Sequence, residues 1–94
     1  MGYWPVSAKA ALANFFKDGQ VEDADVREIV ESSSSSDKEQ LYVTLLAIFV
    51  LMEVFSHKED EWTLLVRKAK AYVKEAGLDK PDKVLRKFNL EVKN

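Results

Sequence analysis

The sequence predicts an all-α fold: a compact bundle of four to five helices around one central apolar helix. Apolar residues recur at spacings of three and four along most of the 94 residues, and strand-like alternation is almost absent. Residues 41–55 are apolar on nearly every face, so other elements must surround them. Since a domain usually has roughly 100–150 residues, we expect residues 1–94 to form a single helical interaction domain.

The first helix is expected to begin after Ser7, a residue type that caps helix N-termini, and to end at Asp18-Gly19. Its apolar face has helical spacing and consists of Ala8, Ala11, Leu12, Phe15 and Phe16. A second helix is expected from Glu22 to Glu31, with acidic residues at its start that suit the helix dipole.

Residues 32–36 are five consecutive serines, which offer no apolar surface to bury. We interpret them as a flexible Ser-rich linker, and a role as phosphate acceptor stays open. The central helix should follow at once, because Ser36 and Glu39 have the spacing of a capping box. It should run through Phe55, and its burial should be the largest single source of stability.

Ser56 and Glu59 offer a second capping box, which predicts a fourth helix over residues 59–76 that ends at Gly77. Its predicted core-facing residues are Trp62, Leu65, Val66, Ala69, Tyr72, Val73 and Ala76. A short last helix should start near Pro81, which is tolerated in a first turn, and bury Val84, Leu85 and Phe88. Leu90 and Val92 are expected to pack as an extended tail.

The composition argues against catalysis and points to binding. The chain has one His and no Cys, so nucleophile–base pairs, disulfides and thiolate metal sites are nearly or fully excluded. Residues 14–25 lack two oxygen ligands of an EF-hand, and His57 stands in an acidic, turn-like segment. We therefore expect no enzyme activity, no cofactor and no metal site.

The start of the chain has no basic and apolar signal region, and the apolar run 41–52 is shorter than the ~20 residues that cross a bilayer. We expect a cytoplasmic protein that does not enter a membrane. With 16 acidic and 14 basic residues, the net charge of -2 also makes a dedicated nucleic-acid binder an unfavoured reading.

The charge is unevenly distributed, because the first 40 residues are acidic and the rest mildly basic. The basic residues gather late in the chain: Arg67, Lys68, Lys70, Lys74, Lys80, Lys83, Arg86 and Lys87. From this group we select Lys83, Arg86 and Lys87 as candidate partner-binding residues. Tyr3 and Trp4 are the other candidates, since a terminal aromatic pair must fold back or meet a partner.

Four features occur here in a characteristic order. They are Gly2-Tyr3-Trp4 before the first helix, an acidic second helix, the apolar helix 41–54, and Asp60-Glu61-Trp62 leading into residues 64–69. This order, over residues 2–76, resembles the C-terminal helical module of proteins that carry VIT and von Willebrand A domains. Vault poly(ADP-ribose) polymerase has a similar module, its major-vault-protein interaction domain. Residues Gly2, Trp4, Glu61 and Trp62 match motif positions, and we assign them to the fold before the interface.

The resemblance implies a non-catalytic adaptor that targets a larger protein to the vault particle through major vault protein. Without the resemblance, the residues predict a protein-interaction module but do not identify its partner. The alternative is a small nucleic-acid-binding or self-associating regulatory domain that uses the basic C-terminal half.

Overall fold

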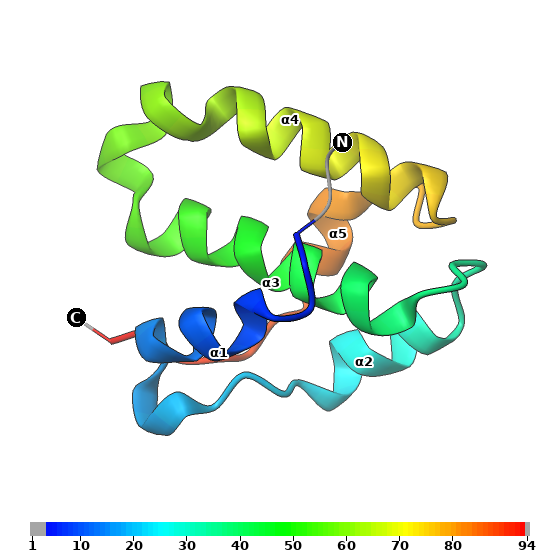
Figure 1. The fold of residues 1–94 in the computed structure, drawn as a ribbon, viewed down its shortest axis with the longest axis horizontal. Helices are drawn as coiled ribbons and strands as arrows, with labels where there is room; N and C mark the ends of the chain where they lie inside the picture. Colours follow the sequence, from blue (N-terminus) through cyan, green and yellow to red (C-terminus); the bar gives the residue numbers. More distant parts are fainter. Residues whose placement is uncertain (1–3, 94) are drawn as a thin grey trace.

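The computed structural model describes residues 4–93 and confirms the all-α bundle. Its five α-helices are α1 (Ala8–Leu12), α2 (Ala24–Glu31), α3 (Lys38–Val54), α4 (Glu59–Glu75) and α5 (Pro81–Leu85). Three single 3-10 turns lie at Ala13–Phe15, Lys17–Gly19 and Ser56–Lys58. Figure 1 shows α4 along one side of α3, with α1 and α2 on the other side.

Helix α3 is the centre of the bundle, as predicted, and contacts all four other α-helices. Leu41, Leu45 and Ile48 have no exposed surface, and the buried residues of α3 lie on every side of the helix. Each fully buried side chain of this size contributes roughly 1.5–3 kcal/mol to folding. The free energy of burial is therefore concentrated in one helix.

The first helix is shorter than predicted, and its cap is different. Ser7 has helical backbone angles and makes no side-chain capping hydrogen bond. The N–H groups of Ala8 and Lys9 instead donate to the carbonyls of Pro5 and Val6, so the first turn begins at the proline. At the other end Phe16 is extended, with φ -109° and ψ 147°, and is fully buried.

Phe16 is extended because it pairs with the C-terminal tail. Phe16 and Val92 form an isolated antiparallel bridge. The Lys17 N–H donates to the Glu91 carbonyl at 2.9 Å, and the Lys93 N–H donates to the Phe15 carbonyl at 2.8 Å. Leu90 and Val92 pack on the core, so the predicted extended tail is confirmed and has a specific partner.

The second helix begins at Ala24 rather than Glu22, because Asp23 is its N-cap. One carboxylate oxygen of Asp23 accepts the N–H groups of Asp25 and Val26, and the other accepts the Asn89 N–H at 2.6 Å. Asp23 is 7% exposed. This carboxylate therefore joins the start of α2 to the tail.

Both predicted capping boxes are wrong. Helix α3 is capped by Asp37, whose carboxylate accepts the Gln40 N–H at 3.0 Å, while Ser36 makes no capping bond. Helix α4 follows a 3-10 turn and has no side-chain cap at Lys58. Asp37 replaces Ser36 because a carboxylate there also suits the positive end of the helix dipole.

The serine run forms a hydrogen-bonded turn between α2 and α3. The hydroxyls of Ser32 and Ser33 donate to carbonyls of the last turn of α2, and Ser34 donates to the Ala76 carbonyl at 3.1 Å. The Lys38 ammonium donates to two serine carbonyls. The flexibility of this run stays a prediction, and the structure adds the contacts that hold it against the end of α4.

Four charged side chains surround Tyr42 and tie α1, α2 and α3 together. Lys9 and Arg27 each contact both Glu22 and Glu39, at N–O distances from 2.5 to 3.2 Å. The Arg27 guanidinium also lies 4.1 Å from the centre of the Tyr42 ring. Glu39, predicted as half of a capping box, serves this network instead.

Helix α4 confirms the prediction in length, and Gly77 follows it with a φ of +106°. Val66, Ala69 and Val73 are its buried residues. Leu65, predicted to face the core, is 54% exposed, because the buried side of α4 is centred on these three residues and leaves Leu65 at its flank.

None of the described helices is by itself long and apolar enough to cross a membrane. Helices α3 and α4, taken together with the turn between them, reach the required length and apolar composition, but they are bent by 90° relative to each other.

Candidate functional site

Two adjoining hollows lie where the end of α3 meets α4 and α5. The first has a volume of about 280 Å³ and is lined by Met52, Glu59, Trp62, Thr63, Val66, Arg67 and Lys70. The second has a volume of about 160 Å³ and is lined by Phe49, Met52, Glu53, Asp82, Leu85 and Arg86. Because Met52 borders both, we treat the two as one surface, the Met52 groove.

The apolar floor of the groove is held in place by the turn between α3 and α4. The indole N–H of Trp62 donates to the carbonyl of Phe55, the residue after α3, at 2.6 Å. This bond fixes the ring against the end of α3 and adds a second donor to a carbonyl that already accepts the Lys58 N–H. Met52 is 39% exposed beside it.

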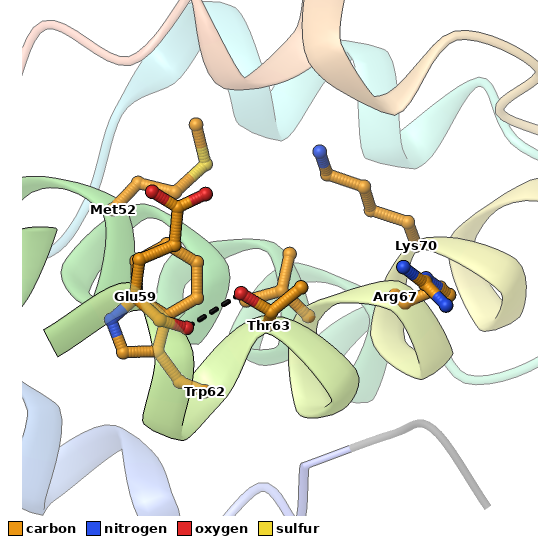
Figure 2. Close-up of a pocket in the computed structure, with 7 residues that line it drawn as sticks. Met52, Glu59, Trp62, Thr63, Arg67 and Lys70 are labelled. Atoms are coloured by element: carbon orange, nitrogen blue, oxygen red, sulfur yellow. Dashed lines mark hydrogen bonds between the residues drawn. The ribbon is translucent and has the colours of Figure 1, made fainter.

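Charges are separated along the groove. Figure 2 shows Met52 and Glu59 gathered near Trp62 at one end, and Arg67 and Lys70 at the other end, further along α4. At the basic end the Lys70 ammonium donates to a carboxylate oxygen of Asp82 at 2.7 Å.

Asp82 shows that several cations share this end of the groove. Its pKa is lowered first by the hydrogen bond from Lys70, which outweighs the opposing effect of burial, and further by the charges of Lys70, Arg86 and Lys74. One carboxylate thus lies among three cations from α4 and the end of α5. The lining as a whole carries three acidic and three basic side chains, so an acidic group of a bound partner fits at the end of the groove where Arg67 and Lys70 lie.

The groove offers binding chemistry: an apolar floor, exposed guanidinium groups and a soft methionine side chain. Tryptophan and arginine are the residue types that most often dominate the energy of protein interfaces, and methionine adapts to varied apolar surfaces. Among residues 4–93 there is no group of three His, Cys, Asp or Glu residues that could hold a metal ion. His57 is exposed in the turn before α4.

No protein-family model, curated protein or solved structure matches this chain. The resemblance to modules of VIT and von Willebrand A proteins therefore stays a prediction.

The structure brings only part of the predicted site together. Arg86 lines the groove, whereas Lys83 and Lys87 are exposed beside it and are not among its lining residues. Trp4 lies elsewhere, where its backbone N–H donates to the Thr44 hydroxyl at 3.0 Å and its ring lines an apolar hollow between α1 and α3. Tyr3 lies outside the described residues.

Sequence reasoning missed Met52, Arg67 and Trp62 as parts of one surface. The apolar run predicts that Met52 lies in a helix buried on all sides, but the last turn of α3 extends past the elements that cover the helix, and Met52 is exposed there. The signal for this was Glu53, which follows Met52 and is exposed. A charged residue in the last turn indicates that this end of the helix meets solvent.

Proposed function

We propose that this chain is a non-catalytic protein-interaction domain that receives a partner segment in the Met52 groove. The observation that carries the proposal is the placement of exposed Met52 and partly exposed Trp62 beside the cations of α4 and α5. The complementary segment has a large apolar side chain to cover Met52 and acidic residues that reach Arg67 and Arg86.

Major vault protein is the partner that the sequence resemblance suggests, and a vault-targeting adaptor in the cytoplasm is the specific form of the proposal. The test is isothermal titration of the purified chain with purified major vault protein. We expect a saturable interaction in the micromolar range, which corresponds to roughly -8 kcal/mol. No heat and no co-elution at high micromolar concentration would overturn the vault form of the proposal.

Two charge-reversal variants test whether the groove is the binding surface. Arg67→Glu and Arg86→Glu reverse charges at its basic end, and each should weaken binding at least ~10-fold, because a desolvated charge at an interface that meets a like charge is costly. Lys17→Glu is the matched control: it makes the same charge change at a 69% exposed side chain in the 3-10 turn after α1. Equal weakening by all three variants would show a general charge effect and refute the groove assignment.

Nucleic-acid binding is the second candidate, because α4, α5 and the turn after α5 carry several exposed basic side chains. They are Arg67, Lys74, Lys83, Arg86 and Lys87. Fluorescence anisotropy with duplex and single-stranded oligonucleotides over a salt series separates the two. Nucleic-acid binding would appear as an affinity that falls steeply with salt. We expect no binding at low salt.

A further inference from the structure

The side of α4 that faces away from the core carries an apolar pair between two opposite charges. Glu61, Leu64, Leu65 and Lys68 follow the spacing i, i+3, i+4, i+7, so they form one stripe along the helix. We call these four residues the α4 stripe. Val66, Ala69 and Val73, which are buried, lie on the adjacent side of the same helix, and Leu65 lies at the flank between the two sides.

The two leucines are the most exposed of the large apolar side chains in residues 4–93. Leu64 is 60% and Leu65 is 54% exposed, while Met52 and Val6 are the other exposed ones. Adjacent leucines on a helix surface leave a continuous apolar patch in water. Such patches are typical of interaction sites rather than of a free surface.

The order of the stripe is self-complementary. Consider a second α4 that packs antiparallel to the first, related to it by a two-fold axis that passes between Leu64 and Leu65. Leu64 of each copy then lies opposite Leu65 of the other copy, and Glu61 of each copy lies opposite Lys68 of the other. The leucines then meet across the axis, and each Glu61 meets a Lys68. With a rise of ~1.5 Å per residue, both charges lie roughly 5 Å from the axis, within reach at the usual packing distance of about 8–10 Å.

Both charges are available for this contact. Glu61 and Lys68 are exposed, and neither makes an ion pair within the described part of the chain. A parallel arrangement would instead place Glu61 against Glu61 and Lys68 against Lys68. Charge complementarity therefore selects the antiparallel arrangement and a second copy of the same chain as the partner.

We propose that two copies of this chain form a two-fold symmetric dimer through the α4 stripe. The dimer is weak and reversible, because one helix pair buries less than the ~1,200–2,000 Å² of a typical stable interface. The Met52 groove is lined by the other side of α4, so it stays open in the dimer. The proposal is thus independent of the function proposed above.

The test is sedimentation equilibrium of the purified chain from about 10 µM to about 1 mM, a range that brackets weak dimers. We expect the average mass to rise toward that of two chains. Glu61→Lys and Lys68→Glu should each keep the protein monomeric, because each places like charges opposite one another twice. The doubly substituted chain, which restores both opposite pairs and keeps the net charge of -2, should dimerise as the unmodified chain does.

An equimolar mixture of the two single variants gives a second, independent readout. One variant then presents two cations and the other two anions at the contact, so the mixture should form a heterodimer although neither variant dimerises alone. Arg67→Glu, a neighbouring charge reversal on the groove side of α4, should leave the dimer unchanged. Circular dichroism confirms that each variant is folded before it is compared.

Three outcomes would overturn the proposal. The first is an unmodified chain that stays monomeric at the highest concentration. The second is a doubly substituted chain that stays monomeric while its helix content and melting curve match those of the unmodified chain. The third is full dimerisation after both leucines are replaced by serine. Since the leucines are exposed, this last variant should fold and lose only the dimer.

Discussion

The hydroxyl of Tyr42 accepts a hydrogen bond from the backbone N–H of Asp23 at 2.8 Å, in the interior of the protein. The same hydroxyl donates to the Val21 carbonyl at 2.6 Å. Tyr42 has no exposed surface, so these two bonds replace water for the only polar atom of its side chain. They fix the segment before α2 over the first turns of α3.

Replacing Tyr42 by phenylalanine should destabilise the protein by about 1–3 kcal/mol. The ring remains packed, but the Asp23 N–H and the Val21 carbonyl lose their partner in a buried place. Urea denaturation gives the free energy of unfolding. Tyr72→Phe is the matched control, because the Tyr72 hydroxyl donates to the Gln40 side chain in a partly exposed place; an equal loss in both variants would contradict the role of burial.

Tyr42 should also make the protein sensitive to alkali. Burial raises the pKa of Tyr42 to about 12, from an ordinary value of 10.0. As the pH rises, the unfolded chain therefore loses the Tyr42 proton at a lower pH than the folded chain does. The stabilisation that the buried neutral hydroxyl gives the fold is complete below pH 10 and is lost as the pH rises toward 12. We expect the gap in unfolding free energy between the unmodified chain and Tyr42→Phe to narrow over this range. A constant gap would refute the assignment.

Asp23→Ala should cost about 2–4 kcal/mol, since it removes the N-cap of α2 and the acceptor for the Asn89 N–H together. Asp37→Ala removes only the cap of α3 at an exposed site, and we expect a loss of ~1 kcal/mol there. Thermal unfolding by circular dichroism compares the two. Hydrogen exchange should show faster exchange at Asn89 in the first variant alone, and similar exchange in both would count against the tie.

The charged network around Tyr42 predicts a loss of stability in acid. The hydrogen bond from Arg27 lowers the pKa of Glu22 against the effect of burial. Burial raises the pKa of Glu39, but hydrogen bonds from Lys9 and Arg27 outweigh it and leave this pKa lowered too. Groups with lowered folded pKa values stabilise the fold above their ordinary value of 4.5, and this stabilisation is lost as the pH falls below it.

The measurement is the unfolding free energy between pH 7 and pH 3 for Glu39→Gln against the unmodified chain. Because Glu39 is 38% exposed, we expect a modest loss at pH 7, under about 1 kcal/mol, and a flatter decline in acid. Glu91→Gln is the control, since its contact with Lys17 is fully at the surface. An acid profile of Glu39→Gln that matches the unmodified chain would refute the role of the network.

Gly77→Ala should destabilise the protein more than a typical surface substitution. Gly77 has a φ of +106°, and an added Cβ would lie 2.5 Å from the Ser34 hydroxyl oxygen and 3.1 Å from the Ser34 backbone nitrogen. Adding Ser34→Ala to Gly77→Ala removes the clash with the Ser34 hydroxyl oxygen but leaves the strain of a positive φ at residue 77. We expect only partial recovery of the melting temperature in the double variant, and full recovery would show that strain is unimportant.

The large elements of this fold follow from local patterns. Helix α3 is predicted from its apolar run, α4 from its spacing and Gly77, and α5 from Pro81 and the residues after it. These signals are local, because each depends on residues within a few turns of one another. The Met52 groove is harder to predict, since it depends on where α3 extends past its neighbours and on how α4 turns at Trp62.

The wrong predictions at Phe16 and Asp23 share a physical cause, which is contact with distant residues. Phe16 leaves the helical conformation because Val92, at the other end of the chain, pairs with it. Asp23 lies before α2 rather than inside it because its carboxylate also holds Asn89. The sequence pattern around Phe16 and Asp23 contains neither partner, so no periodicity in their own segments could reveal them.

The pairing of Phe15–Lys17 with the tail has a consequence for synthesis of the protein on the ribosome. The strand-like contact that covers Phe16 needs Val92 and Lys93, which are translated after every α-helix described above. The nascent chain therefore carries α3, the most apolar of these helices, without a complete cover until Val92 and Lys93 have left the ribosome. This domain therefore reaches its final state only after residues 92–93 have been released from the ribosome, and chaperones that bind exposed apolar helices have that interval in which to act.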